Sequence, residues 1–137
     1  EAPHQVVGMA KALELSYEHL NEERQTITEL RDYCKAKLEE NFPGIKINGN
    51  GSTFYNVLNI LLPFTPEKAA MILFSLDMKG IAVSRGSACQ SGSQKPSHVL
   101  AEFLNEEDIK KPSLRVSFGH ENTKEEIDFL IDVLKEV

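Results

Sequence analysis

The chain of 137 residues has the length of about one domain, and its 41% hydrophobic and 26% charged residues are ordinary for a globular protein. A net charge of −6 excludes nonspecific nucleic-acid binding, because no basic stripe is available to neutralise phosphates. No apolar run approaches the ~20 residues that span a bilayer, and the first residues lack the pattern of a signal peptide. The expected location is therefore the cytoplasm, without membrane contact.

Residues 1–42 are predicted to be helical, because apolar residues recur there at steps of three and four. The polar run at 21–24 divides these apolar residues into two stripes. This division indicates either two helical segments or one long helix with different neighbours along its length. Cys34 belongs to the second stripe, so we expect its thiol to be an inert, buried packing group. The two stripes are Val6, Met9, Leu13, Tyr17 and Leu20, then Ile27, Leu30, Cys34 and Leu38.

Turn and capping residues divide the rest of the chain. Pro43 cannot continue the first helix, and Pro66 favours the first turn of the next. Thr123 and Glu126 have the spacing of a capping box, which predicts the start of a closing helix. The predicted elements are strands at 45–48 and 57–62, a helix at 65–80, a strand at 81–84, a short helix near 99–103, a strand at 113–119 and a helix from 123 onward.

Residues 113–119, SLRVSFG, alternate as a half-buried strand does: Leu114, Val116 and Phe118 face one way, and Arg115 and Ser117 face the other. The order of elements predicts an α+β fold, with a small sheet of about four strands covered by helices and preceded by a long helix.

The segment SRGSACQSGSQKPSH, residues 84–98, places Cys89 among small polar residues. A thiol acts as a nucleophile only as a thiolate, which exposure and nearby positive charge favour, and Arg85, Lys95 and His98 supply that charge. Two other interpretations stay open: a surface loop that happens to carry a cysteine, and an anion-binding loop built from backbone N–H groups and Arg85. The spacing of the glycines excludes a P-loop.

Neither the cysteines nor the histidines have the spacing of a metal site. Cys34 and Cys89 lie 55 residues apart without a C-x-x-C pattern. We expect no disulfide between them, because a chain without a secretory signal is expected in a reducing compartment. No metal is predicted.

Several motifs carry a family resemblance. SRGSACQSGSQKPSHVL is followed by LRVSFG and TKEEID, and it is preceded by FYNVLNI and EAPHQVVGMAKALEL. Together these motifs resemble the C-terminal part of the cysteine desulfurases, the pyridoxal-phosphate enzymes of the class-V aminotransferase group that take sulfur from L-cysteine. The likeness covers practically the whole chain.

The resemblance implies roles for two residues. Cys89 matches the catalytic cysteine, whose thiolate takes the sulfur of L-cysteine as a persulfide and leaves L-alanine. Arg115 matches the arginine that binds the substrate carboxylate through two parallel donors. The long Gly- and Ser-rich loop resembles the branch that serves iron–sulfur cluster assembly, so the implied partners are sulfur-acceptor or scaffold proteins. Selenocysteine is the alternative substrate.

The resemblance also implies what this chain lacks. In the family the Schiff-base lysine, the acid at the pyridine nitrogen and the ring-stacking histidine belong to a large domain, which would precede Glu1. We therefore expect a C-terminal fragment that neither binds pyridoxal phosphate nor turns over cysteine by itself, of a parent that is a homodimer. Residues 1–20 would end the large domain, and residues 21–137 would form the small domain. The alternative is a sulfur-relay or docking module without turnover.

Two residues depart from the family pattern. Gln90 replaces a small hydroxyl residue that is more frequent in the family, and Arg85 replaces a small residue. Both would change the charge or the acceptor choice of the loop rather than the identity of the nucleophile.

Overall fold

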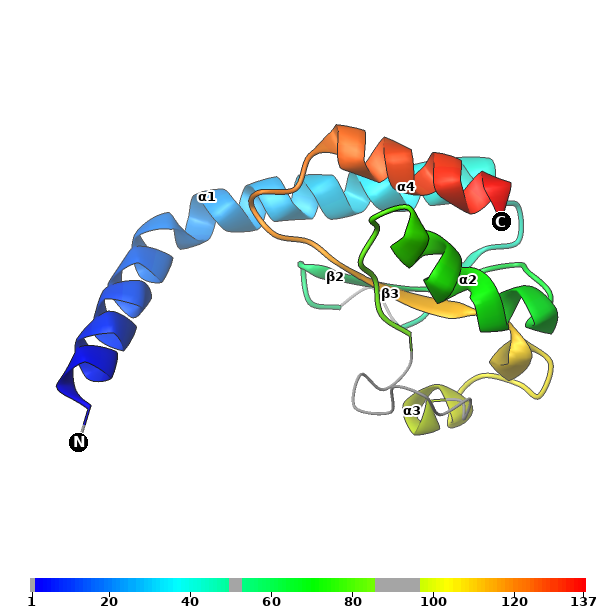
Figure 1. Cartoon of the computed structure of the whole chain (residues 1–137), viewed down its shortest axis with the longest axis horizontal. Coiled ribbons are helices and arrows are strands. Elements are labelled where there is room, and N and C mark those ends of the chain that lie inside the picture. The colour runs from blue at the N-terminus through cyan, green and yellow to red at the C-terminus, as the bar shows by residue number, and fades with distance from the viewer. Residues whose placement is uncertain (1, 50–52, 86–96) are drawn as a thin grey trace.

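A computed structural model describes residues 2–49, 53–85 and 97–137 (Figure 1). Helices and strands are interspersed along the chain. The strands of the described residues form an antiparallel sheet with the order β1-β2-β3. The α+β class predicted from the sequence is confirmed. In chain order the elements are α1 (Pro3–Asn41), β1 (Lys46–Ile47), β2 (Val57–Leu61), α2 (Pro66–Met78), α3 (His98–Ala101), η2 (Asp108–Lys110), β3 (Ser113–Ser117) and α4 (Lys124–Glu136).

The segment predicted as a fourth strand, residues 81–84, contributes a single bridge instead of a strand. Ser84 pairs with Arg115 of β3: the Arg115 N–H donates to the Ser84 carbonyl at 2.7 Å, and the Ser84 N–H donates to the Arg115 carbonyl at 3.2 Å. Gly80, with φ of +78°, turns the chain out of α2 immediately before this segment. The segment therefore meets the edge of β3 at one residue only.

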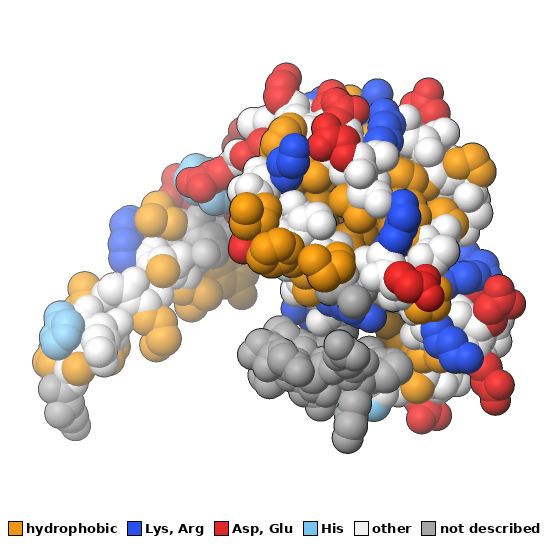
Figure 2. All heavy atoms as spheres, turned by 45° about the vertical axis from the view of Figure 1, so that its right-hand side comes forward, with side chains coloured by type: hydrophobic (Ala, Val, Ile, Leu, Met, Phe, Trp, Pro, Cys, Tyr) orange, Lys and Arg blue, Asp and Glu red, His pale blue; other side chains and the backbone are white. Residues whose placement is uncertain are grey.

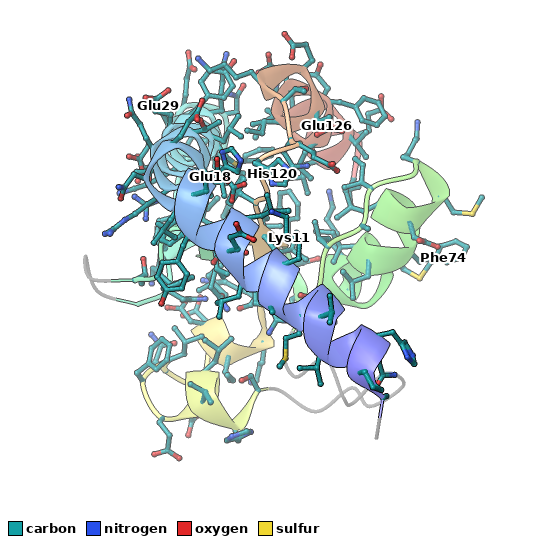
Figure 3. All side chains as sticks on the ribbon, turned by 90° about the vertical axis from the view of Figure 1, so that its left-hand side faces the viewer. Lys11, Glu18, Glu29, Phe74, His120 and Glu126 are labelled. Atoms are coloured by element: carbon teal, nitrogen blue, oxygen red, sulfur yellow. The ribbon has the colours of Figure 1, made fainter. Side chains whose placement is uncertain are left out.

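The core lies between one face of the sheet and the helices. Leu58 and Ile60 of β2 pair with Val116 and Leu114 of β3, and all four side chains are buried on the face that α1 and α4 cover (Figure 1). Asn59 and Arg115, which alternate with them, face the opposite side. That opposite side is where α3 lies, as Figures 1 and 3 agree.

Helix α1 is continuous over 39 residues, and its two halves have different surroundings. Ile27, Leu30, Cys34 and Leu38 are buried against the sheet and α4, which confirms the second stripe. The first half projects beyond the rest of the molecule, and its hydrophobic side chains are exposed (Figures 1 and 2). The first stripe is thus helical, as predicted, but it contacts no core within the described chain.

The projecting half leaves the domain near Glu23. His120, which follows β3, places Nδ1 3.9 Å from the Glu23 carboxylate, and Figure 3 shows His120 beside α1 with Lys11 and Glu18 on the projecting part. In the buried half, the Tyr33 hydroxyl donates to the Asp128 carboxylate of α4 at 2.8 Å. These contacts lie where α1 joins the folded part.

The capping predictions have different outcomes. Thr123 accepts a hydrogen bond from the Glu126 N–H, and the Glu126 side chain accepts one from the Thr123 N–H, so the predicted capping box is present. Thr65 and Pro66 do begin α2, but the Thr65 side chain makes no capping bond to the helix backbone.

An ionic cluster holds η2 to β1. The carboxylate of Asp108, which is buried, accepts hydrogen bonds from Lys111 at 2.7 Å and from Lys46 at 2.5 Å. Lys46 belongs to β1, so this cluster ties the segment after α3 to the edge of the sheet. None of the helices in the described parts of the chain combines the length and apolar content that a bilayer span requires.

Candidate functional site

A row of polar side chains crosses the face of the sheet opposite the core. Residues that pair directly across antiparallel strands share a face. Asn59 pairs with Arg115, and Arg115 pairs with Ser84. On the other side of β2, the Asn48 N–H donates to the Asn59 carbonyl at 2.8 Å, which continues the register of β1. Asn48, Asn59, Arg115 and Ser84 therefore form one row, which we call the polar row.

Arg115 occupies the third position of the polar row. Its neighbours in sequence, Leu114 and Val116, are buried in the core, and they fix the strand so that the Arg115 side chain leaves on the other face. The Arg115 side chain is half-buried, and it forms no ion pair with a carboxylate of the described residues. Its guanidinium is a planar fork of donors that suits a carboxylate ligand.

The two asparagines of the polar row are joined side chain to side chain. Asn48 is buried, and its Nδ2 donates to the Asn59 Oδ1 at 2.9 Å. Because that oxygen accepts this bond, the Asn59 amide turns its donor nitrogen away from Asn48. The row thus presents neutral and cationic donor groups.

One end of the polar row leads into the segment that carries Cys89. Ser84 pairs with Arg115, and Cys89 follows five positions later, outside the described residues. The chain is described again from Ser97, whose Oγ accepts a bond from the Leu100 N–H at 3.5 Å at the start of α3. The exposure and charge predicted around Cys89 therefore stay predictions, although His98 is exposed at the start of α3.

Cys34 has the surroundings that the sequence predicts. Its side chain has no exposed surface, and burial among apolar residues raises the pKa of its thiol to about 12. A thiol that stays protonated is a poor nucleophile. Of the two cysteines, Cys34 is thus the structural one.

Acidic neighbours hold three lysines of the described residues, Lys37, Lys46 and Lys111, in the charged form, which does not suit a cofactor-binding amine. A Schiff-base lysine needs an unprotonated nitrogen, whereas hydrogen bonding to Asp108 raises the pKa of Lys111, and the charge of Tyr33 with that of Asp128 raises the pKa of Lys37. Lys46 is engaged by the same Asp108 carboxylate. Within these residues there is also no group of three His, Cys, Asp or Glu side chains that could hold a metal ion.

Arg115 is a candidate from the sequence, whereas its neighbours in the polar row, Asn48 and Asn59, are not among the sequence-based candidates. The position of Asn59 inside the apolar run VLNIL was the available signal, because a polar residue in such a run usually faces a specific partner. The sheet register that brings Asn48 and Asn59 beside Arg115 is not local, so their neighbourhood appears only in the structure.

The two curated relatives described next are both longer than this chain. The cysteine desulfurase IscS of Dictyoglomus turgidum is 37% identical over 134 residues, which cover 96% of this chain and 33% of that protein. A probable mitochondrial cysteine desulfurase of Dictyostelium discoideum is 32% identical, covering 94% of this chain and 28% of its own length. The chain thus spans about a third of the length of these relatives.

Comparison with solved structures agrees on the fold. The X-ray structure of a NifS-like protein from Rickettsia africae superposes with a TM-score of 0.73 at 29% identity, over 89% of this chain and 31% of that protein. The family model for aminotransferase class-V matches residues 1–130, nearly the whole chain. With its fold and sequence in agreement, the chain belongs to the aminotransferase class-V family, and the curated relatives that it resembles are named cysteine desulfurases.

Proposed function

We propose that this chain supplies the sulfur-accepting nucleophile and the carboxylate-binding arginine of a cysteine desulfurase. The nucleophile is Cys89 and the arginine is Arg115. The complete activity belongs to a protein of about three times this length, because the curated relatives have that length. The substrate is L-cysteine, and the products are L-alanine and a persulfide on Cys89.

The observation that carries the proposal is the pairing of Ser84 with Arg115. Two backbone hydrogen bonds join the residue that leads into the Cys89 segment to the residue that matches the carboxylate-binding arginine. A nucleophile and a substrate clamp must act on the same small molecule, so their attachment to one edge of the sheet supports a shared site.

The sulfur transfer follows from the chemistry of the thiolate. The Cys89 sulfur attacks the sulfur of L-cysteine, so that an S–S bond forms while the substrate C–S bond breaks. The electron pair of the broken bond stays with the substrate carbon, which takes up a proton and becomes the methyl group of alanine. The guanidinium of Arg115 holds the carboxylate by two parallel hydrogen bonds, which fixes the position of the substrate sulfur.

Pyridoxal phosphate, when bound, supplies the electron sink that makes the substrate C–S bond breakable. From the resemblance to the family we assign the cofactor site to the remainder of the longer protein, and the raised pKa of Lys37 and Lys111 agrees with that assignment. In the same proposal, residues 1–20 pack against that remainder as the end of its large domain, and residues 21–137 form the small domain.

The proposed partners accept the persulfide sulfur for iron–sulfur cluster or thio-cofactor assembly, and the longer protein acts as a homodimer in the cytoplasm. A carrier must reach an acceptor protein, and the small polar residues around Cys89 suit such a transfer. Selenocysteine stays the alternative substrate.

The experiment measures alanine formed from L-cysteine by the full-length protein with pyridoxal phosphate and a thiol reductant. Cys89→Ser should abolish alanine formation, whereas Cys34→Ala should retain it, because Cys34 lies in the core. Arg115→Lys keeps the positive charge but removes the planar guanidinium with its two parallel donors. It should raise KM for L-cysteine by about tenfold or more.

Mass spectrometry of the protein after one turnover should find one added sulfur atom on the peptide that contains Cys89. Alanine formation that persists in the Cys89→Ser variant would contradict the nucleophile. A persulfide acquired only from an added sulfur donor, with no alanine from cysteine, would instead favour the sulfur-relay module.

A further inference from the structure

We propose that Asn59 is a second donor to the substrate carboxylate, beside Arg115, and that Asn48 positions it. The inference rests on the proposed function, since it adds a residue to the same carboxylate site. It concerns the polar row alone, and each of the three side chains belongs to the described part of the sheet.

The register places Asn59 and Arg115 next to each other on one face. They are direct partners across the β2–β3 ladder. Direct partners in an antiparallel pair have Cβ atoms about 4.5–5.5 Å apart, which is close enough for an amide and a guanidinium to contact one small anion together. The core residues on either side, Leu58 and Ile60 in β2, hold Asn59 to this face.

The bond from Asn48 sets the direction of the Asn59 amide. Asn48 is 7% exposed, and its Nδ2 donates to the Asn59 Oδ1. The Asn59 oxygen therefore points toward Asn48. The Asn59 Nδ2 hydrogens point away from Asn48 and can donate to another group. The Asn59 oxygen has a second acceptor position, but within the described residues Arg115 makes no hydrogen bond to it. Asn59 therefore adds a donor beside the guanidinium without occupying it.

The chemical complement of the row is an anion with several acceptor sites. A carboxylate has about four acceptor positions, and a bidentate arginine occupies two of them. The Asn59 amide can fill a third. The row contains Asn48, Asn59, Arg115 and Ser84, and no acidic side chain, so nothing in it competes with the substrate for these donors.

At the Lys46 end the same face is closed. Leu61 and Ser113 pair two residues along the ladder from Asn59 and Arg115, on the same face of the sheet, and both are buried. The Asp108 cluster fastens η2 to Lys46 at that end. Toward the other end Ser117 is exposed, so a small ligand at the row would be bounded on one side and accessible from the other.

The test replaces Asn59 in the full-length protein with pyridoxal phosphate. Asn59→Ala and Asn59→Ser remove the amide donor, and Asn59→Asp places a negative charge opposite the carboxylate at nearly unchanged size. KM for L-cysteine should rise about tenfold for Ala and Ser, as expected for a hydrogen bond to a charged group, and further for Asp. Asn21→Asp, at an exposed position on α1, is the matched control and should leave KM unchanged.

Inhibition by non-reacting ligands separates a donor role from a structural one. L-alanine carries the carboxylate and ethylamine does not. Asn59→Ser should weaken inhibition by L-alanine about tenfold and leave inhibition by ethylamine unchanged. Asn48→Ala should have a smaller effect in the same direction, because it frees the Asn59 amide to rotate.

Equal weakening of both inhibitors would assign Asn59 a merely structural role and overturn the inference, as would a wild-type KM in the Ser and Asp variants. Failure here is distinguishable from failure of the proposed function. If Cys89→Ser abolishes turnover and Arg115→Lys raises KM while the Asn59 variants behave as wild type, only the Asn59 inference is wrong.

Discussion

Cys34 shows how a single side chain's surroundings decide its chemistry. It lies on the buried stripe of α1 with no exposed surface, and burial raises the pKa of its thiol to about 12. Because alkylating reagents react with the thiolate, we expect Cys34 to be protected in the native chain. Cys89, in a small polar segment, should react first with iodoacetamide at pH 8, and the labelled peptides should be identified by mass spectrometry.

Both cysteines should react at similar rates after denaturation, which controls for their intrinsic reactivity. Equal rates in the native chain would contradict the enclosed position of Cys34 or the accessibility expected for Cys89. Cys34→Ala, which leaves one thiol, would show which of the two assignments fails.

Asp108 makes the stability of the η2 region dependent on pH. Hydrogen bonds from Lys111 and Lys46 lower the pKa of its carboxyl from 3.8 to about 2 in the folded state. A lowered folded pKa stabilises the fold above the unfolded pKa, and this contribution is lost as the pH falls through the folded value. Asp108→Asn should therefore melt several degrees below the wild type at pH 7, and the gap should shrink between about pH 4 and pH 2.

Asp132→Asn is the matched control for this melting series. Asp132 pairs with Lys135 on the exposed surface of α4, where an ion pair contributes little. If the difference in melting temperature between Asp108→Asn and the wild type stays constant with pH, the variant acts through packing rather than through the charge.

At the scale of an element, α1 is one helix with two kinds of environment. Leu38 has no exposed surface in the core, whereas Leu13 is 58% exposed on the projecting half. Leu38→Ala should lower the free energy of unfolding by about 2–5 kcal/mol, because it leaves a cavity. Leu13→Ala should change it by less than about 0.5 kcal/mol in this chain. Urea denaturation followed by circular dichroism measures both, and similar losses in the two variants would contradict the division of the helix.

The start of α4 depends on its capping box. Thr123→Ala removes the hydroxyl that accepts the Glu126 N–H, and it should lower the free energy of unfolding by about 1 kcal/mol. Thr26→Ala, at an exposed position inside α1, removes a hydroxyl with no capping role, and alanine is the better helix former there. A loss in the Thr26 variant as large as that in the Thr123 variant would argue against the cap.

Local signals account for the elements that the sequence predicted well. Thr123 and Glu126 lie three residues apart, and the stripe from Ile27 to Leu38 repeats along one helix face, so each pattern is complete within a short window. The segment 81–84 looked like a strand, but whether a strand forms depends on pairing with β3, and only Ser84 pairs. The spacing of the first stripe of α1 predicts a helix but not what covers it.

The candidate site likewise has one part that a local pattern predicts and one part that depends on long-range pairing. The alternation in SLRVSFG placed Arg115 opposite the core side chains, as the structure has it. Its partners Asn48 and Asn59 come from positions more than 50 residues earlier in the chain. Only the ladder register joins them, and register is decided by packing of the whole sheet.

At the scale of the whole molecule, two surface features agree with the proposal that this chain acts as part of a longer protein. The first half of α1 carries exposed apolar residues, and the polar row ends beside a segment that carries a thiol. Unpartnered apolar surface and a donor-rich sheet face both suit contact with a further region of protein. A chain that spans about a third of its relatives' length is expected to have such surfaces.

The isolated 137-residue chain should consequently neither retain pyridoxal phosphate nor form alanine from cysteine. Within the described residues, the two lysines with a shifted pKa do not suit the cofactor, because hydrogen bonding and charge raise the pKa of Lys111 and Lys37 and keep both protonated. After incubation with the cofactor and gel filtration, the protein fraction should carry no cofactor absorbance, and alanine should stay at the level of a protein-free blank. The full-length protein, treated identically, is the positive control. Cofactor that co-elutes with the chain and supports alanine formation would locate a complete active site within these residues and overturn the assignment of the cofactor to the remainder of the protein.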